Sequence, residues 1–373
     1  MDVSSEMIHG LLPVFLVSVL HTPAIYVGLI EGISESTALI GRTVSGVLSD
    51  WLGKRKILAL AGYTLATLTK PLFALASSVD VVFAARFLDR LGKGIRGAPR
   101  DALIADATPL HLRGAAYGLR QSLDNVGAFL GPALAIVLMI VYAGDFRRVF
   151  WVAVIPGVIS VTILTFAVRE PAGLSGNIAR QPTEYREILN LGRSYWLVVA
   201  FGSAFNLARF SEAFLLLRAE NIGLAIHMVP AILIIMSVVY AVSAYPAGHL
   251  SDRMGRTGFI VAGLCVLIVS HLVLAAAETS VHVGIGAGLW GLHMGLTQGL
   301  LAAMVSDTAD EKRRGTAFGL FSMISGLAML MASLFAGMLW DYFGPPAPFW
   351  AGSIFAAGSL VGFVVFRGHL TNG

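Results

Sequence analysis

Twelve long apolar stretches follow one another along the chain, and they decide what it can fold into. A helix that crosses a membrane needs about 20 mostly apolar residues. The runs are continuous and lack the alternating pattern of membrane β-strands. We therefore expect an all-α membrane protein with twelve transmembrane helices, near residues 3–20, 23–49, 57–77, 80–106, 114–142, 149–168, 191–217, 223–250, 258–277, 281–306, 316–340 and 346–366.

The composition excludes the main alternatives. Charged residues make up 13% of the chain and the mean hydropathy is +0.78, whereas soluble domains carry about 25% charged residues. A soluble protein could not bury so much apolar surface, and a disordered chain would be more polar. Cys265 is the only cysteine, which excludes a disulfide scaffold. Scattered basic residues argue against a nucleic-acid partner, and without metal-ligand spacing we expect no metal and no cofactor.

One polar stretch divides the chain into two groups of six helices. We expect an N-terminal bundle at 1–168, a cytoplasmic linker at 169–190 and a C-terminal bundle at 191–373. Lys and Arg mark cytoplasmic loops, and they concentrate on the linker side, so we predict that both termini are cytoplasmic. The residues on that side are Lys54, Arg55, Lys56, Arg113, Arg253, Arg256, Lys312, Arg313 and Arg314, against Arg147, Arg148 and Arg218 on the other.

The two halves share sequence. Residues 46–56 (GVLSDWLGKRK) match residues 248–257 (GHLSDRMGRT) at an offset of 202, and residues 106–119 match residues 307–320 at an offset of 201. Self-similarity at a nearly constant offset indicates a duplicated unit, here of six helices. Residues 191–202 have no counterpart ahead of Met1, so we expect the first helix to be truncated at its N-terminus.

At these positions the chain resembles the major facilitator superfamily. The loop motif of that family is matched twice, although Trp51 and Thr257 stand where basic residues are usual. The fifth apolar stretch resembles the antiporter motif of the family, with Ala135 and Ile136 in place of two glycines. The matching residues are Gly46, Leu48, Ser49, Asp50, Gly53, Lys54 and Arg55, then Gly248, Leu250, Ser251, Asp252, Arg253, Gly255 and Arg256, and Gly118, Gly127, Gly131 and Pro132 in the antiporter-like stretch.

The resemblance implies two pseudo-symmetric bundles that alternate access to a central cavity, with the loop motifs latching the inner gate. Residues 2–8, 31–36 and 89–106 look like one prokaryotic branch of the superfamily, which implies the prokaryotic plasma (inner) membrane. The alternative for the loop motif is a basic loop that only fixes the membrane topology. The alternative for the glycines is that they only pack helices together. We expect a monomer in the lipid bilayer.

Ionisable residues inside the apolar stretches are the candidate transport residues, because each costs several kcal/mol in a membrane. Asp124 lies one helical turn after Arg120, and we rank this pair first for proton coupling, followed by Asp89 or Glu35. The alternative is a static lattice of ion pairs. The other interior charges are Arg86, Arg90, Lys93 and Arg100 in one stripe, Glu31, Asp2 and Glu6, and in the second half Arg209 and Glu212.

The second half offers uncharged candidates instead, namely Asn206, Trp290, His293 and Gln298, with His293 expected to be a packed polar residue. The leading hypothesis is a secondary transporter that exports a small molecule coupled to protons. The alternatives are an uptake permease for an anion attracted to the Arg86–Arg100 stripe, and a lipid translocase. An enzyme or receptor is disfavoured because no nucleophile–base pairing is present, and Gly92, Gly94 and Gly97 follow no strand that would make a dinucleotide site.

Overall fold

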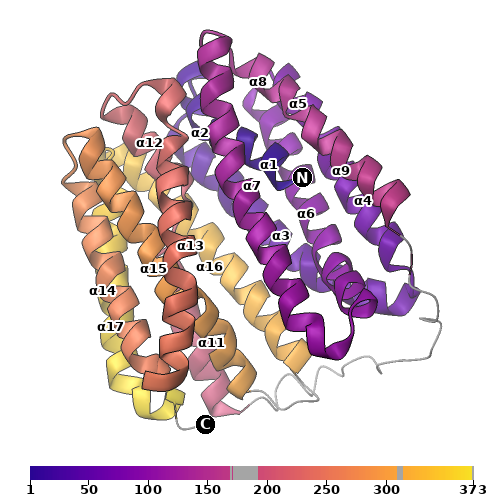
Figure 1. Ribbon diagram of the computed structural model, residues 1–373. Coiled ribbons are helices and arrows are strands. Elements are labelled where there is room, and N and C mark those ends of the chain that lie inside the picture. The colour runs from indigo at the N-terminus through magenta and orange to yellow at the C-terminus, as the bar shows by residue number, and fades with distance from the viewer. Residues whose placement is uncertain (169, 171–191, 309–313, 372–373) are drawn as a thin grey trace. The chain divides into compact units, whose positions relative to one another are not determined.

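The structure is a computed structural model that describes residues 1–168, 170, 192–308 and 314–371. Within these residues every regular element is helical, as the sequence predicts. The first half contains α1 (Asp2–His9), α2 (Leu12–Val14), η1 (Phe15–Val19), α3 (Ala24–Leu52), α4 (Arg55–Leu68), α5 (Lys70–Leu75), α6 (Val79–Ala107), η2 (Leu110–Leu112), α7 (Arg113–Val141), α8 (Phe146–Val152) and α9 (Val154–Ala167) (Figure 1).

The second half repeats this order with fewer interruptions. Its elements are α11 (Arg193–Leu207), α12 (Ala213–Asn221), η3 (Ile226–Met228), α13 (Ala231–Met254), α14 (Arg256–Ala275), α15 (Ser280–Thr308), α16 (Arg314–Phe343) and α17 (Ala347–Thr371). Helices α13, α15, α14 and α17 pack in that order, each against the next (Figure 1). The first helix of each half is broken, between α1 and α2 and between α11 and α12.

Contacts divide the chain into two compact units. Unit 1 comprises Met1–Thr22 and Ile33–Gln181, and unit 2 comprises Pro23–Gly32 and Pro182–Gly373. The first turns of α3 therefore belong with the second half, where Asp341 of α16 accepts hydrogen bonds from the backbone N–H groups of Ala24 and Ile25. The predicted linker lies almost wholly outside the described residues, and the predicted domain boundaries stay a prediction.

Nine helical segments in the described part of the chain are long and apolar enough to cross a membrane. They coincide with nine of the twelve predicted stretches. The remaining three stretches are helical too, but α6 carries many charges, α11 and α12 are interrupted at 208–212, and α15 is rich in glycine. Crossing of the membrane by these three stays a prediction.

Glycines bring the helices of unit 1 into backbone contact. A Cβ atom added at Gly62 of α4 would lie 2.6 Å from the carbonyl oxygen of Gly92 on α6, and one at Gly92 would lie 2.7 Å from that of Gly62. Gly94 makes a similar approach to Gly41 of α3, and Ser45 donates a hydrogen bond to its carbonyl at 2.9 Å. The G-x-G-x-x-G stretch therefore serves helix packing, as small residues do in membranes.

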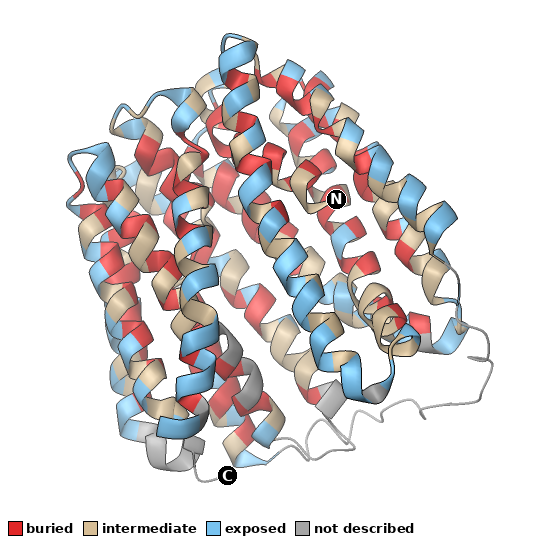
Figure 2. Cartoon of the chain, viewed as in Figure 1, coloured by how far each residue is buried: buried red, intermediate tan, exposed pale blue. Residues whose placement is uncertain are grey.

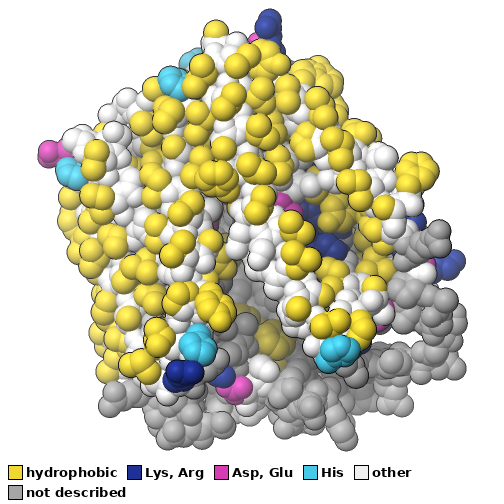
Figure 3. All heavy atoms as spheres, viewed as in Figure 1, with side chains coloured by type: hydrophobic (Ala, Val, Ile, Leu, Met, Phe, Trp, Pro, Cys, Tyr) yellow, Lys and Arg dark blue, Asp and Glu magenta, His cyan; other side chains and the backbone are white. Residues whose placement is uncertain are grey.

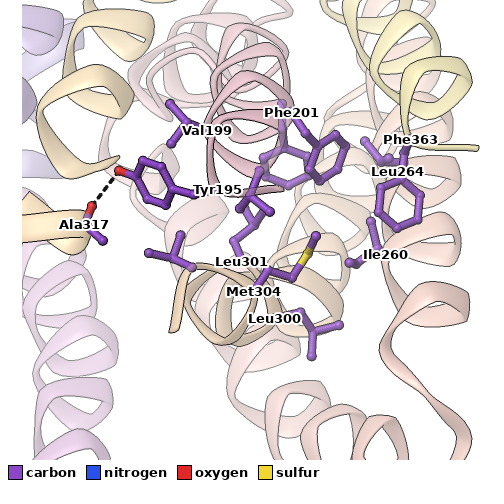
Figure 4. Close-up of a cluster of buried hydrophobic side chains, with 13 residues drawn as sticks. Tyr195, Val199, Phe201, Ile260, Leu264, Leu300, Leu301, Met304, Ala317 and Phe363 are labelled. Carbon is purple, nitrogen blue, oxygen red and sulfur yellow. Dashed lines mark hydrogen bonds between the residues drawn. The ribbon is translucent and has the colours of Figure 1, made fainter. Parts of the chain in front are cut away.

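The core of unit 2 at its α11 end is hydrophobic and aromatic (Figure 4). Phe201 and Phe363 bring their ring centroids to 4.9 Å, and the hydroxyl of Tyr195 donates to the carbonyl of Ala317 at 2.9 Å. Val199, Ile260, Leu264, Leu300, Leu301 and Met304 complete the labelled part of the cluster. These contacts join α11 to α14, α15, α16 and α17.

The exposed faces of the helices are as apolar as their buried faces. Leu123 on α7, Ile163 and Phe166 on α9 are 61%, 56% and 82% exposed, and both helices show runs of exposed residues in Figure 2. The face drawn in Figure 3 is mostly hydrophobic, with few charged side chains. An apolar exterior of this extent suits lipid rather than water.

Replacing Gly62 with alanine is expected to lower the stability of the protein. The added methyl group would clash with the backbone of α6, and overpacking of this kind costs about 1–3 kcal/mol. The check is the apparent melting temperature of the detergent-purified protein, which should fall by several degrees. Gly358→Ala is the matched control, because an added Cβ there meets no atom within 4 Å. Equal melting temperatures for the two variants would contradict the packing described.

Candidate functional site

The first loop motif forms a tight turn with an ion pair across it. Gly53 has φ +61°, a left-handed conformation that favours glycine. Arg55, the first residue of α4, pairs with Asp106 near the end of α6 at 2.5 Å. The Glu170 carboxylate accepts from the N–H groups of Arg55 and Lys56 at 2.7 and 2.9 Å, and so caps α4.

The second loop motif has the same geometry. Gly255 has φ +89°, α14 begins at Arg256, and Arg256 pairs with Asp307 near the end of α15. Both members of this pair lie 201 residues after Arg55 and Asp106. The duplicated ion pair supports the duplication inferred from sequence.

Other motif residues have smaller or undescribed contacts. Lys54 is exposed. A Cβ added at Gly46 would meet only the Cβ of Ala98, at 3.4 Å, and one at Gly248 would meet nothing within 4 Å. The side chains of Asp50 and Asp252 lie outside the described residues, so their predicted capping role stays a prediction.

The antiporter-like stretch lies on α7 and contacts α1. A Cβ added at Gly131 would lie 2.5 Å from the Cβ of Glu6, and one at Gly127 would lie 2.9 Å from the Cβ of Asp2. Pro132 is buried within the helix, whereas Gly118 has open space around it. Two of the motif's glycines thus let α7 approach the helix that carries Asp2 and Glu6.

The interior charges of unit 1 form pairs around α6. Asp89 is 3% exposed and accepts from Lys70 Nζ at 2.7 Å, with Arg90 Nε 3.7 Å from its second oxygen. Lys70 also donates to the hydroxyl of Ser5 at 3.0 Å. Arg90 Nη1 lies 3.2 Å from Glu35 Oε1. Ion pairs therefore join α6 to both α3 and α5.

Two more arginines of α6 have partners of their own, Arg86 of the stripe and Arg96 outside it. Arg86 donates to Nδ1 of His9 at 2.6 Å, and Arg96 lies 3.2 Å from Asp2 and 4.7 Å from the ring centroid of Tyr63. Each of these contacts ties α6 to α1 or α4. Arg86, Arg90 and Arg100 of the stripe are thus engaged within the protein, whereas Lys93 forms no ion pair with the described residues.

The side chains of Arg120 and Asp124, the pair ranked first for proton coupling, lie within hydrogen-bond distance of each other. Arg120 Nη2 lies 2.8 Å from Asp124, and Arg120 Nη1 lies 2.8 Å from Asp101 on α6. Arg100 of α6 also lies 3.5 Å from both Asp124 and Asp101. Asp124, about a quarter exposed, is therefore shared between guanidinium groups on α7 and α6.

Lys93 and Glu6 differ from their neighbours. Neither forms an ion pair or side-chain hydrogen bond with any residue that the structure describes. Lys93 is nevertheless the cation with the strongest electrostatic effect on Glu6, and Glu35 and Glu6 are the acidic groups that act on Lys93. Glu31, one turn before Glu35 on α3, is 1% exposed and belongs to unit 2.

In unit 2, residues with aromatic or imidazole rings occupy positions that correspond to charged residues of unit 1. His271 and Trp290 lie 201 residues after Lys70 and Asp89, and they too are buried and in contact, with ring centroids 5.2 Å apart. His293 is fully buried and its Nδ1 faces the carbonyl of Gly263 at 2.8 Å, a geometry that agrees with the expected packed histidine. Asn206 is buried, and the side chain of Gln298 lies outside the described residues.

Sequence reasoning missed Lys70 and Glu170, and it noted Asp101 only as a charge near the predicted cytoplasmic end of its helix. Lys70 could have been found, because it is a lone cation inside an apolar stretch and such residues need partners. Asp101 and Glu170 follow from spatial proximity that no periodicity reveals. Among the described residues, no group of three His, Cys, Asp or Glu side chains could hold a metal ion.

Comparison with known proteins decides the family. The model of the Major Facilitator Superfamily matches residues 1–217 and 196–371. The chain belongs to the major facilitator superfamily. An uncharacterized MFS-type transporter of Methanocaldococcus jannaschii is 33% identical over 373 residues, covering 97% of this chain and 92% of that protein. Members of this family are transporters, not enzymes.

More distant relatives support the same fold. Multidrug resistance protein 1 of Bacillus subtilis is 23% identical over 86% of this chain and 82% of its own length. A mutant form of the nucleoside transporter NupG superimposes with a TM-score of 0.80 at 12% identity, over 98% of this chain and 96% of that one. The transporter therefore is an integral membrane protein with the superfamily's fold.

Replacing Lys70 with methionine is expected to destabilise this transporter strongly. The change removes the closest cation from the buried Asp89 carboxylate, and breaking a buried pair costs about 3–5 kcal/mol. The double variant Lys70→Met with Asp89→Leu should recover most of that loss, because no charge is then left unpaired. Melting temperature and yield of monodisperse protein measure both variants. A double variant less stable than Lys70→Met would contradict the ion-pair explanation.

Proposed function

We propose that the protein is a secondary active transporter that exports a small organic molecule in exchange for protons by alternating access. The observation that carries the proposal is the position of Asp124 between Arg120 on its own helix and Arg100 on α6. A carboxylate whose cationic neighbours are on two helices changes its surroundings when one helix moves. Loss of a cationic neighbour favours proton uptake, and its return favours release.

The repeated loop ion pairs support alternating access. Arg55 with Asp106 and Arg256 with Asp307 join corresponding helix ends in the two units. Pairs that form in one state and open in another bias a two-state equilibrium. We assign them the role of latches on the linker side, which we propose to be cytoplasmic together with both termini.

The antiporter-like stretch supports export. Gly127 and Gly131 hold α7 against Asp2 and Glu6 of α1, so movement of α7 would reach the carboxylate of Glu6 as well as Asp124. The multidrug resistance relative points in the same direction. The host is proposed to be prokaryotic, with the protein in the plasma (inner) membrane as a monomer.

The alternative of anion uptake along the Arg86–Arg100 stripe has weaker support. Arg86, Arg90 and Arg100 each have a partner within unit 1, whereas Lys93 forms no ion pair with the described residues. A substrate anion would have to displace those partners. Lipid translocation has no specific observation in its favour.

Asp124→Asn is expected to abolish dependence of transport on a proton gradient, because asparagine cannot exchange a proton. A thermal-shift screen of metabolites and drugs selects the compound that stabilises the purified protein most. That compound is then followed into inside-out vesicles with an acidic lumen, with and without nigericin. Asp80→Asn is the matched control, since Asp80 is exposed at the start of α6. Uptake insensitive to nigericin in the wild type would overturn proton coupling.

Asp106→Asn and Asp307→Asn are each expected to weaken the latch and slow transport. A half-buried pair is worth about 1 kcal/mol, which corresponds to about a fivefold change in the population of one state. The charge-exchanged variant Arg55→Asp with Asp106→Arg should recover part of the rate. Transport initial rates in the same vesicles give the comparison. Rates unchanged in both single variants would show that the loop only fixes topology.

A further inference from the structure

Arg209 is a cation at the break in the first helix of the second half. It lies in the non-helical residues 208–212 between α11 and α12. Its side chain is half-buried, its Nε atom is fully buried without a hydrogen-bond partner, and it forms no ion pair with any residue that the structure describes. An unpaired guanidinium at this depth is costly, so its presence calls for a function.

The surroundings of Arg209 are aromatic. Its guanidinium carbon lies 5.8 Å from the ring centroid of Phe205, which itself lies 5.2 Å from the imidazole of His293. Glu212 and Tyr240 are the other groups that act on its charge, Glu212 more strongly.

The same group of rings holds other nitrogen atoms without partners. Trp290 Nε1, His293 Nε2 and His271 Nδ1 are buried and lack a hydrogen bond within the described residues. Trp290 contacts Phe210, the residue after Arg209, with centroids 5.7 Å apart. These three residues are at most 1% exposed, so their unpaired atoms lie in the packed interior beside Phe205 and Phe210.

Hydrogen bonds satisfy backbone groups at the break between α11 and α12. Ala208 O faces His271 Nε2 at 2.9 Å, and Ser211 N donates to the hydroxyl of Ser333 at 3.1 Å. Non-helical backbone at membrane depth is tolerated where protein groups satisfy it, and transporters place substrate sites at such interruptions. The break therefore fixes Arg209 in place.

We propose that Arg209 binds an anionic group of the transported molecule, a carboxylate or similar planar oxyanion. A guanidinium matches a carboxylate through two parallel hydrogen bonds. The proposal rests on the proposed transport function and deepens it by naming the substrate class. It moves anion recognition from the stripe on α6 to unit 2.

The labelling rates of an introduced cysteine test the electrostatic potential near Arg209 without any substrate. In a Cys265→Ser, Tyr240→Cys background, the reagents are anionic sulfonatoethyl and cationic trimethylammonioethyl methanethiosulfonate. We expect the ratio of anionic to cationic labelling rates to fall about tenfold on adding Arg209→Gln. Arg193→Gln, an exposed arginine on α11, should leave the ratio unchanged. An unchanged ratio in Arg209→Gln, or no labelling by either reagent, would overturn the proposal.

A binding measurement tests the ligand class. Thermal shifts are recorded with benzoate, benzamide and benzylamine, which share size and ring but differ in charge. Benzoate should stabilise the wild type and the Arg193→Gln variant, Arg209→Lys should keep part of the shift, and Arg209→Gln should lose it. Equal shifts with benzamide, no shift with benzoate, or full retention in Arg209→Gln would overturn the proposal. Neither test uses a proton gradient, so failure of proton-coupled export is detected separately.

Discussion

Electrostatic pairing in an apolar surrounding organises unit 1. The ammonium of Lys70 and the carboxylate of Asp89 are 2.7 Å apart and almost fully buried. Once these charges are inside, each added charge requires a neighbour of opposite sign, since a lone ion there costs several kcal/mol. Arg90 reaches Glu35, and Arg96 reaches Asp2, in the same way. The helices of unit 1 are thus placed by charge as well as by shape.

The two units show that one backbone plan supports two kinds of interior. Repeat-equivalent positions hold an ion pair in unit 1 and the rings of His271 and Trp290 in unit 2. The loop ion pairs, in contrast, recur in both units. The shared ion pairs lie at the helix ends, where the proposed latches act. The differences lie in the interiors, where we propose that unit 1 exchanges protons and unit 2 binds the substrate.

The sequence predicted the helical class, the family and the positions of the apolar stretches, because hydropathy and glycine turns are local signals. It also predicted the contact of Arg120 with Asp124, since residues one turn apart share a helix face. It could not predict that Arg100 and Asp101 join them, because pairing between helices depends on rotations that one sequence does not reveal. Nor could it show that the arginine stripe is already paired, or that Arg209 is not.

The correspondence between Lys70 with Asp89 and His271 with Trp290 constrains how the two halves diverged. Replacing one member of such an ion pair by a side chain that carries no charge leaves the other ion in the interior without its counter-ion. Such a stage is expensive, so the change would have required a side chain that is polar yet able to be neutral at one of the two positions. Histidine satisfies that condition, and its survival at position 271 is consistent with a neutral intermediate in the history of the second half.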